Sequence, residues 1–322
     1  MKHILGIDGG GTKTICVVMD EQRHILGRGE AGSSNYQIVG INTAKKSIES
    51  AMNQAVLTAL KFPDNIIYNL KNKITINAIS LGLAGVGRSR DIKVIKNIVR
   101  DLQTSNSLPI IWDVKPHNII ISHDALISLV GGIGDDLGIV VACGTGSIVF
   151  GKNQQGKTKR VGGWGNILGD EGSAYQIAVS GIKAVLKAYD GRGEKTYLTA
   201  AFKNHLGLES VEDLIEIVYQ SGWSVKDIAA LAVVVDNAAV NRDAIANRII
   251  DNAVEELVKS VYVVVDELFQ PGDNIEIVTT GSLWKCKCKI RDRFARSLDG
   301  MKIIIPRFEP VYGAALLGLR SL

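Results

Sequence analysis

Two glycine-rich segments of the sequence have the composition of phosphate-binding turns. DGGGTK (residues 8–13) and GTGS (residues 144–147) each lie between two apolar runs. Tight turns of this kind expose backbone N–H groups and hydroxyls that can surround phosphate oxygens. A plain hairpin turn is the better explanation of either segment alone. Their occurrence at equivalent points of two similar halves of the chain favours phosphate binding.

The two common nucleotide-binding loops do not fit these segments. A P-loop requires a lysine after its second glycine, whereas Thr12 follows Gly11 here. The dinucleotide-binding fingerprint requires a third glycine and a helix directly afterwards. Strand-like sequence follows both turns instead. We therefore predict two hairpin turns that bind phosphate.

An acid and four cysteines are the other candidates for chemistry. Asp124 follows the strand-like run NIIIS and precedes an apolar, helix-like run, so the residues alone fit a helix N-cap as well as a catalytic base. Cys16, Cys143, Cys286 and Cys288 are too few for a disulfide scaffold and lack the spacing of a four-ligand zinc site. We interpret them as reduced thiols, with Cys286 and Cys288 on the solvent face of a basic helix.

These residues lie in two halves that begin alike. Each half opens with strands around a glycine turn and continues with helices and strands, which suggests a duplication with an active cleft between the halves. The first half is expected to contain strands 2–8, 14–19, 24–30, 74–85 and 118–122, helices 42–60 and 89–102, and a loop over 104–117. The second half is expected to contain a strand, turn and strand over 136–152, strands 157–163, 275–281 and 301–306, helix 172–189, a mostly helical region 196–268, a helix within 283–298 and a last helix from Val311.

Composition limits the function classes. The chain has 322 residues, of which 46% are hydrophobic and 22% charged, so it is long enough for two globular domains. Its net charge is only +4 and no long block of like charge occurs, which argues against nucleic acid or an anionic membrane as a partner. The sequence shows neither a signal peptide nor a long apolar run, so we expect a cytoplasmic protein.

Several segments, in this order, resemble a known family. IDGGGTKT, GSSN (32–35), GLAG (82–85), HDA (123–125), CGTGS, GGWGNILGDEGSAY (162–175) and TGSLW (280–284) resemble the N-acetylglucosamine kinase and BadF/BadG/BcrA/BcrD ATPase family nearly end to end. That family belongs to the superfamily of sugar kinases, heat-shock ATPases and actin. The resemblance implies an α/β fold of two ribonuclease-H-like (actin-like ATPase) domains with an ATP and sugar cleft between them. We expect one domain at residues 1–133 with 310–322, and the other at 134–309.

The resemblance also implies roles for individual residues. Asp124 is the expected catalytic base, and Asp8 is expected to organise Mg²⁺ through water. Lys13 adds positive charge, and the Gly281-Ser282 turn lies against adenosine. The expected ATP-binding residues are Asp8, Gly9, Gly10, Gly11, Thr12, Lys13, Gly144, Thr145, Gly146, Ser147, Gly281 and Ser282. The expected sugar-binding residues are Asn35, Asp124, Gly163, Trp164, Gly165 and Asp170.

Three of the expected sugar contacts also have plainer explanations. Asp170 can be a surface acid before a helix, Asn35 a routine turn residue and Trp164 a core side chain. Glycines on both sides of Trp164 favour an aromatic wall of the sugar pocket, because a ring can lie flat against a sugar face.

The resemblance implies ATP-dependent phosphorylation of a hexose or amino sugar, first of all N-acetylglucosamine, at the 6-hydroxyl and with Mg²⁺. One residue departs from the family, because Ile148 follows GTGS where N-acetylglucosamine kinases have an asparagine. The loss of one polar contact changes discrimination between sugars by about 1–3 kcal/mol. Glucosamine, N-acetylmuramic acid, glucose and other hexoses therefore stay open as substrates. Many relatives dimerise, so a homodimer is also implied.

Two other functions fit parts of the sequence. An ATPase that activates 2-hydroxyacyl-CoA dehydratases would bind an iron–sulfur cluster between two subunits, and Cys143 beside GTGS is suggestive of one. The positions of the other cysteines and the GGWG element argue against it. A nucleotide-dependent filament or binding protein would turn over ATP without a sugar.

Overall fold

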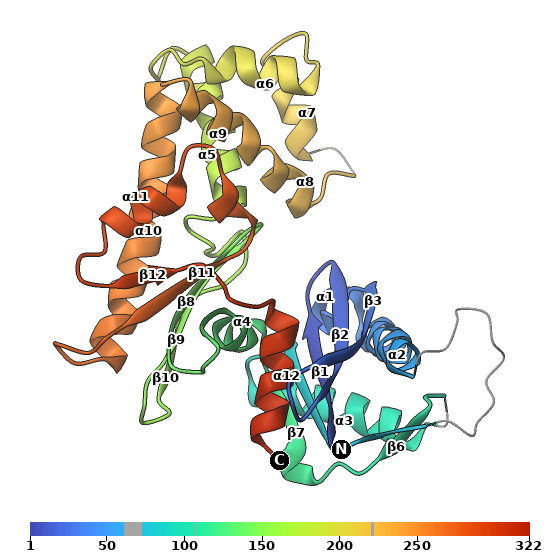
Figure 1. Cartoon of the computed structure of the whole chain (residues 1–322). Coiled ribbons are helices and arrows are strands. Elements are labelled where there is room, and N and C mark those ends of the chain that lie inside the picture. The colour runs from blue at the N-terminus through green and yellow to red at the C-terminus, as the bar shows by residue number, and fades with distance from the viewer. Residues whose placement is uncertain (61–72, 106, 220–221) are drawn as a thin grey trace. The chain divides into compact units, whose positions relative to one another are not determined.

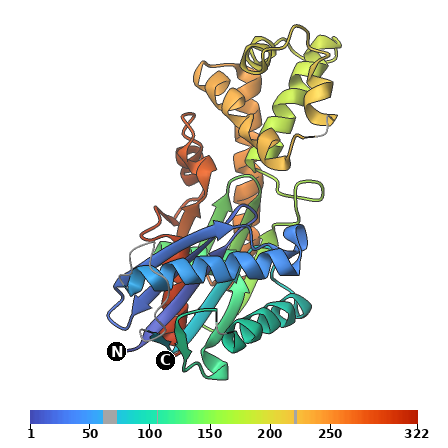
Figure 2. The ribbon, with the colours of Figure 1, turned by 90° about the vertical axis from the view of Figure 1, so that its right-hand side faces the viewer.

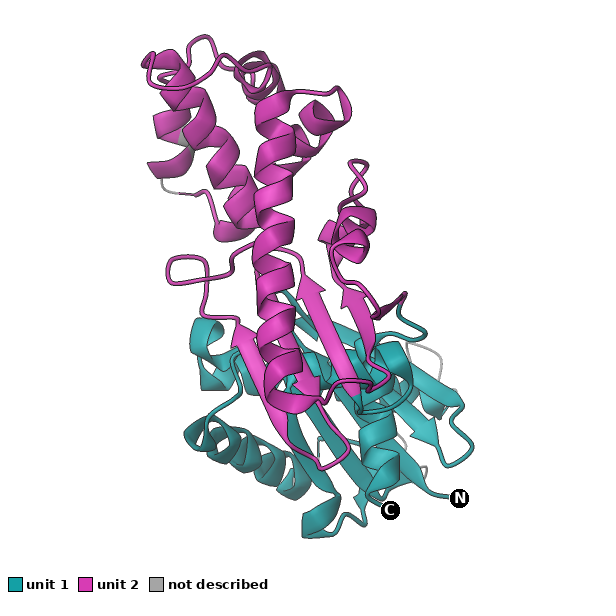
Figure 3. Ribbon diagram, turned by 90° about the vertical axis from the view of Figure 1, so that its left-hand side faces the viewer, with its two compact units in different colours: residues 1–137, 306–322 teal, residues 138–305 magenta. Residues whose placement is uncertain are grey.

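A computed structural model describes residues 1–60, 73–105, 107–219 and 222–322 of the chain. These residues form two compact units, which Figure 3 shows in teal and magenta. Unit 1 consists of residues 1–137 and 306–322, and unit 2 consists of residues 138–305. The boundaries expected from the sequence, 133/134 and 309/310, lie a few residues away, and the assignment of the units as two ATPase domains stays a prediction.

Unit 1 is built on a mixed five-stranded sheet. Its strands are β1 (His3–Gly9), β2 (Lys13–Asp20), β3 (Ile25–Gly32), β5 (Ala78–Leu83) and β7 (Ile119–His123). The order is β3-β2-β1-β5-β7, in which β1, β2 and β3 are antiparallel neighbours and β5 pairs in parallel with β1 and β7. Figure 1 labels β1, β2, β3 and β7 of this sheet. A parallel pair, β4 (Ile74–Ile76) and β6 (Ile110–Trp112), places a strand within the segment that was expected to be a loop over 104–117.

Helices cover both faces of this sheet. They are α1 (Tyr36–Val39), α2 (Ile41–Ala59), α3 (Ser89–Thr104), the short 3-10 helix η1 (Pro116–Asn118), α4 (Asp124–Ile133) and α12 (Pro310–Arg320). Alternate side chains of β2 point to opposite faces, as the period of a strand requires. Cys16 packs with α2 and α3, whereas Val17 packs with α4 and α12. Figure 2 shows α2, in blue, crossing the strands of the sheet.

Unit 2 repeats the topology of the unit 1 sheet. Its strands are β8 (Gly138–Cys143), β9 (Ser147–Lys152), β10 (Thr158–Gly162), β11 (Glu276–Thr280) and β12 (Lys302–Ile304). The order is β10-β9-β8-β11-β12, again with an antiparallel group of three strands followed by two parallel neighbours. This repetition agrees with the two similar halves that the sequence predicts.

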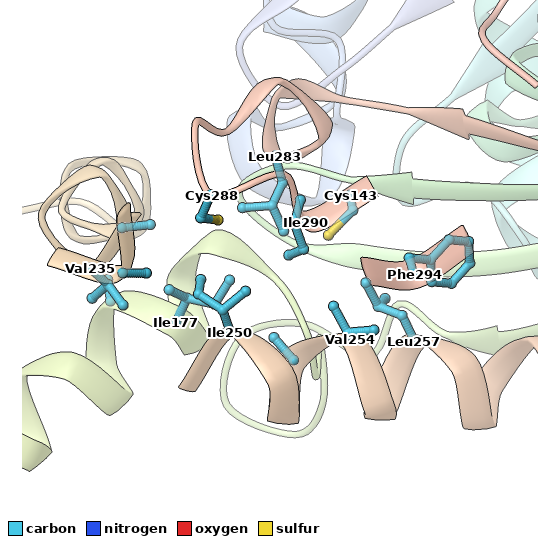
Figure 4. Close-up of a cluster of buried hydrophobic side chains, with 14 of the residues drawn as sticks. Cys143, Ile177, Val235, Ile250, Val254, Leu257, Leu283, Cys288, Ile290 and Phe294 are labelled. Atoms are coloured by element: carbon cyan, nitrogen blue, oxygen red, sulfur yellow. The ribbon is translucent and has the colours of Figure 1, made fainter. Parts of the chain in front are cut away.

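Among the residues that the structure describes, unit 2 contains a larger set of helices than unit 1. They are α5 (Ala174–Tyr189), α6 (Leu198–Leu206), α7 (Leu214–Tyr219), α8 (Val225–Ala230), α9 (Ala232–Val240), α10 (Ala244–Leu268), the 3-10 helix η2 (Ser282–Lys285) and α11 (Ile290–Arg296). Apolar residues of α10 recur at helical spacing and form one core with the sheet and α11, in which Figure 4 labels Val254, Leu257 and Phe294.

Two sequence expectations need correction. The single helix expected within 283–298 is instead η2, a turn over residues 286–289, and α11. In that turn Cys288 is buried, so the Cys-Lys-Cys segment is not the solvent face of a helix. Separately, none of the helices in the described ranges is long and apolar enough to cross a membrane.

Candidate functional site

The first glycine turn joins β1 to β2 as the sequence predicts. Gly9 pairs with Thr14 across the hairpin, and the amide of Gly10 donates to the carbonyl of Lys13 at 2.8 Å. A Cβ at Gly9 would collide with Ser34 and Leu83, so packing inside unit 1 explains this glycine.

Gly10 and Gly11 differ from Gly9 because unit 1 does not require them to be glycine. A Cβ added to Gly10 would make its nearest contact at 3.5 Å, and one added to Gly11 would make it at 3.8 Å, both ordinary distances. Neither residue has a positive φ. The two positions therefore leave open a space beside backbone N–H groups, and an approaching anion fits that space.

Two carboxyl groups of unit 1 influence each other at this turn. Asp8 ends the apolar run of β1, and Asp124 begins α4 directly after β7. Burial raises the pKa of Asp8 to about 7, and the carboxyl of Asp124 contributes further to this rise. Burial also raises the pKa of Asp124, although the backbone amides of Asp124 and Ala125 donate to its carboxylate and oppose the rise. The structure thus brings together the two acids expected to serve in metal binding and catalysis.

The helix N-cap at α4 is His123 and not Asp124. The side chain of His123 accepts a hydrogen bond from the amide of Leu126 at 3.2 Å, and Asp124 has already entered the helix. The N-cap explanation of Asp124 is therefore wrong. Because capping is done by the neighbouring residue, the carboxylate of Asp124 is available for another task.

The acids beside the first turn fit a magnesium ion. Mg²⁺ is usually bound by one or two carboxylates together with water and substrate phosphates. Asp8 and Asp124 disfavour each other's ionised form, as the raised pKa of Asp8 shows. A cation near them would favour both carboxylates. Asp8 is the residue that would hold such an ion.

The segment that contains Asn35 is fastened to both neighbouring loops. Asn35 caps α1 by accepting a hydrogen bond from the amide of Gln37, and a Cβ at Gly85 would lie 2.8 Å from the Asn35 Oδ1 atom. Gln37 donates to the carbonyl of Gly85 at 2.5 Å, and Ser33 donates to the carbonyl of Gly10 at 3.1 Å. Asn35 is therefore held beside the first glycine turn, within unit 1.

A network around the buried carboxylate of Asp91, which the sequence did not suggest, supports this segment. Asp91 in α3 is fully buried and accepts hydrogen bonds from the Tyr36 hydroxyl at 2.6 Å and the Arg88 Nε at 2.9 Å. The backbone amides of Gly87 and Arg88 donate to the same carboxylate. The Arg88 guanidinium, together with the Tyr36 hydroxyl and the two backbone amides, holds the pKa of Asp91 well below its usual range, although burial acts in the opposite direction. The sequence contains no sign of this network, because Tyr36 is distant along the chain from Arg88 and Asp91 and the three residues match no known motif.

The second glycine turn joins β8 to β9 and is contacted by Asp170, an acid from a later loop of the same unit. The amide of Gly144 donates to the carbonyl of Gly146 at 2.9 Å. A Cβ at Gly146 would lie 2.5 Å from the Asp170 Oδ2 atom. Asp170 has a positive φ of 58° and accepts hydrogen bonds from the amides of Gly165 and Ser147. Asp170 therefore joins the second turn to the GGWG loop.

Trp164 belongs to the GGWG loop, and Ile148 packs against the same loop. Trp164 is 65% exposed, so it is not a core side chain, and the guanidinium carbon of Arg160 lies 4.3 Å from the centre of its ring. Ile148 fills the space that a Cβ at Gly163 would need, at 2.9 Å. The branched hydrocarbon that replaces the family's asparagine thus packs against this loop. Gly165 has a positive φ of 91° and open space around it.

The Gly281-Ser282 turn lies beside the second glycine turn in unit 2. Gly281 has a positive φ of 102°, and a Cβ there would collide with the carbonyl of Cys143. A Cβ at Gly144 would lie 3.5 Å from the Ser282 hydroxyl. The structure thus brings together Gly144, Thr145, Gly146, Ser147, Gly281, Ser282, Gly163, Trp164, Gly165 and Asp170 in unit 2. It places Asp8, Gly9, Gly10, Gly11, Thr12, Lys13, Asn35 and Asp124 in unit 1.

A cavity of about 320 Å³ in unit 1 is lined by residues other than those expected to bind ATP or sugar. Its walls include Arg28, Phe308, Glu309 and Tyr312. Arg28 and Glu309 form an ion pair at 2.7 Å, and both charges act on the pKa of Asp8, Arg28 lowering it and Glu309 raising it. Charged residues of the cavity wall therefore influence the pKa of an acid at the first turn, although none of the wall residues is expected to bind ATP or sugar.

The chain is similar to known proteins along almost its whole length. The family model of the BadF/BadG/BcrA/BcrD ATPases matches residues 5–318. The chain is 34% identical to the N-acetylmuramic acid/N-acetylglucosamine kinase of Clostridium acetobutylicum, over 98% of each chain. It is 33% identical to the N-acetyl-D-glucosamine kinase of Dictyostelium discoideum, again over 98% of each chain. These matches confirm the resemblance, and they confirm the expected enzyme class, a sugar kinase.

Solved structures support the fold. The crystal structure of a proposed N-acetylglucosamine kinase from Chromobacterium violaceum has a TM-score of 0.75 and 24% identity, with 99% of both chains covered. A ROK family glucokinase from Streptomyces griseus, crystallised with glucose and AMPPNP, has a TM-score of 0.51 and 15% identity, with 98% of both chains covered. The expected α/β fold of the actin-like ATPase kind, here with two mixed five-stranded sheets, is therefore confirmed.

Proposed function

Because this chain belongs to the BadF/BadG/BcrA/BcrD ATPase family, we propose that it transfers the γ-phosphoryl group of ATP to a hydroxyl of an amino sugar. N-acetylglucosamine is the first candidate, and its 6-hydroxyl is the proposed acceptor. The names of the two full-length relatives support this choice of substrate. The observation that carries the proposal is the pair of interacting acids, Asp8 and Asp124, beside a glycine turn with open space at Gly10 and Gly11.

Each unit by itself has its own proposed ATP contacts. In unit 1 the amide of Gly11, the Thr12 hydroxyl and the Lys13 ammonium donate to phosphate oxygens, while the Gly10 amide closes the turn on the Lys13 carbonyl. In unit 2 the turn of residues 144–147 donates to the remaining phosphates, and the Gly281-Ser282 turn lies against adenosine. Such contacts position the phosphates and stabilise their charge, which is most of what phosphoryl transfer requires.

A bound Mg²⁺ would neutralise charge on the phosphate oxygens during transfer. Asp8 is proposed to hold that ion through water. Burial and the carboxyl of Asp124 raise the pKa of Asp8 to about 7, so its carboxylate would gain from the positive charge that a metal ion supplies. A nearby cation would keep Asp8 ionised at neutral pH.

Asp124 is the proposed general base. Its carboxylate accepts the proton of the sugar hydroxyl as that oxygen forms a bond to the γ-phosphorus and the bond from this phosphorus to the bridging oxygen of ADP breaks. The N-terminus of α4 fixes the carboxylate, because two backbone amides donate to it. His123 caps the helix and so keeps this end of α4 in place.

The proposed sugar contacts are Asn35, Trp164, Asp170 and the glycines beside Trp164. The exposed ring of Trp164 offers a flat apolar face, which suits the face of a sugar ring. Ile148 packs against the loop that contains Trp164 and provides no amide. We therefore propose that this enzyme discriminates between acetamido and hydroxyl groups differently from kinases with asparagine at that position.

The decisive test of the mechanism is Asp124→Asn. The variant is expected to lower kcat about 10²–10⁴-fold, the usual contribution of a positioned base, with the KM for the sugar nearly unchanged. ADP release with a panel of hexoses and amino sugars measures both. Asp101→Asn, which changes an exposed acid of unit 1, is the matched control. Near-normal turnover of the Asp124 variant would contradict the assignment.

The same sugar panel tests the proposed substrate class. Turnover that requires an amino sugar or N-acetylated sugar supports the proposal, whereas ADP release that is independent of any sugar points to the filament or binding class. Iron bound by anaerobically purified protein would favour the dehydratase activator. The homodimer implied by the resemblance is checked by light scattering on the same sample.

A further inference from the structure

The turn that contains Cys286 and Cys288 has a shape that brings the two thiols together. It lies between η2 and α11 in unit 2, and the amide of Lys289 closes it by donating to the carbonyl of Cys286 at 3.3 Å. Lys289 itself has a positive φ of 57°. Cys286 is half-buried, whereas Cys288 is only 7% exposed.

A buried acid of another helix fixes this turn. Asp236 in α9 is 5% exposed and accepts the amide of Lys287 at 3.0 Å and that of Cys288 at 2.8 Å. Both donors are consecutive backbone amides, so the carboxylate holds the middle of the turn. Cys288 belongs to the hydrophobic core of unit 2 and Cys286 packs against the same core, and each thiol changes the pKa of the other. Two neighbouring thiols on a fixed turn form a dithiol.

We propose that Cys286 and Cys288 are a redox modification site that a peroxide converts reversibly to an intramolecular disulfide. The Cys286 thiolate attacks the peroxide, its sulfur is oxidised to a sulfenic acid, and the O–O bond breaks with release of water or alcohol. The Cys288 thiol then attacks that sulfur, the S–S bond forms and water leaves. Two thiols lose two electrons in total, and the peroxide gains them.

The environments of the cysteines assign the first step to Cys286. The hydrogen bond from the Cys288 thiol lowers the pKa of Cys286, while the same contact, with burial and Asp236, raises the pKa of Cys288. The thiolate is the nucleophile in such chemistry. Cys16 and Cys143 are fully enclosed, and burial raises the pKa of both, so they are expected to stay inert. Within the described ranges, no three Cys, His, Asp or Glu residues form a group that could hold a metal.

A disulfide across one intervening residue is expected to be easy to reduce. It closes a very small ring, which forces the sulfur bond away from its preferred geometry. Strained disulfides have more oxidising potentials and are the labile, regulatory ones. A thiol reductant should therefore restore the dithiol completely.

The position of the turn gives the modification a consequence for nucleotide binding. The turn follows η2, which begins at Ser282, directly after Gly281. Gly281 is in close contact with the carbonyl of Cys143, so a shift of η2 would be transmitted to the second glycine turn. We expect the oxidised enzyme to show a KM for ATP about fivefold higher, the effect of one weakened hydrogen bond. This second effect rests on the proposed function, whereas the modification itself does not.

The experiment treats the purified full-length protein with hydrogen peroxide, blocks free thiols and maps the peptides by mass spectrometry. The expected product is one Cys286–Cys288 disulfide, with the loss of two hydrogen atoms and full reversal by dithiothreitol. Cys286→Ser should abolish it, and Cys16→Ser, the matched control at a buried cysteine, should leave it unchanged. Because the disulfide is measured in the unaltered protein, the result does not depend on whether a variant folds.

The outcomes separate the modification from the proposed function. A sulfinic acid at Cys286, a disulfide that includes Cys143, or a disulfide between two copies of the chain would overturn the dithiol proposal. A Cys286–Cys288 disulfide with unchanged KM for ATP would overturn only the link to the nucleotide turns. A disulfide that forms in a protein without sugar kinase activity would support the modification site and count against the proposed function.

Discussion

The two glycine turns occupy the same place in two sheets of the same topology, yet their acids are used differently. In unit 1, Asp8 precedes the turn, and its carboxyl faces another carboxyl, that of Asp124, which helps raise its pKa to about 7. In unit 2, Asp170 comes from a later loop and accepts two backbone amides, one of them in the turn. The first acid is left with a repulsive neighbour, whereas the second is satisfied by its own unit.

The glycines of the two turns differ in the same way as the acids, because packing requires a glycine in the unit 2 turn but not at Gly10 and Gly11. Gly10 and Gly11 have room for a Cβ, while Gly146 is a glycine because the Asp170 carboxylate lies where its Cβ would be. A residue that the fold does not need is a better candidate for a ligand contact than one that packing explains. Packing therefore explains Gly146, whereas it leaves Gly10 and Gly11 free for the proposed phosphate contacts, and Asp170 holds the second turn in addition to its proposed sugar contact.

The largest expected effect comes from exchanging each acid for its amide. The pKa of Asp8 in the folded protein, about 7, lies above its ordinary value of 3.8. The protonated Asp8 carboxyl therefore contributes its full stability below about pH 3.8, and this contribution is lost as the pH rises through about 7. At about pH 8, Asp8→Asn should raise the free energy of unfolding by at most about 4 kcal/mol, with almost no effect near pH 4.

Burial raises the pKa of Asp170 as well, but two backbone amides oppose that rise, so Asp170→Asn carries a hydrogen-bonding cost that Asp8→Asn lacks. The amide oxygen of the variant can accept from only one of the two backbone N–H groups, and its NH₂ group faces the other donor. This should lower the free energy of unfolding by about 1–3 kcal/mol. Urea denaturation of both variants as a function of pH measures the pair. If both substitutions changed the free energy of unfolding in the same direction at about pH 8, the distinction between the two acids would be wrong.

The second effect compares a glycine of each turn. Gly10→Ala should leave the melting temperature nearly unchanged but raise the KM for ATP at least about tenfold, because the methyl group occupies the proposed phosphate space. Gly146→Ala should lower the free energy of unfolding by about 1–3 kcal/mol through the contact with Asp170. Calorimetry and ADP-release kinetics separate the two outcomes. A Gly10 variant that is unstable and binds ATP normally would assign this glycine to packing.

Much of the fold and of the site could be predicted because the signals are local. Apolar runs around each glycine turn specify the hairpins, and the order of motifs specifies the family. The break between η2 and α11 could not be predicted, since Asp236 of a distant helix holds that turn open. The cap by His123 and the attachment of Asp170 to the second turn are also tertiary contacts, which helix and turn propensities do not encode.

The smallest expected effect concerns the segment beside the unit 1 turn. Tyr36→Phe removes the hydroxyl that donates to the fully buried Asp91, at a cost of roughly 1 kcal/mol in the free energy of unfolding. Since Asn35 precedes Tyr36, the KM for the sugar should rise a few-fold while kcat changes little. Tyr189→Phe is the matched control, because its hydroxyl also bonds a carboxylate, that of Glu212, but on the exposed surface of unit 2. Equal effects of the two substitutions on the sugar KM would remove Tyr36 from the site, whereas a change confined to Tyr36→Phe would extend the ligand role of the unit 1 turn to the segment fastened beside it.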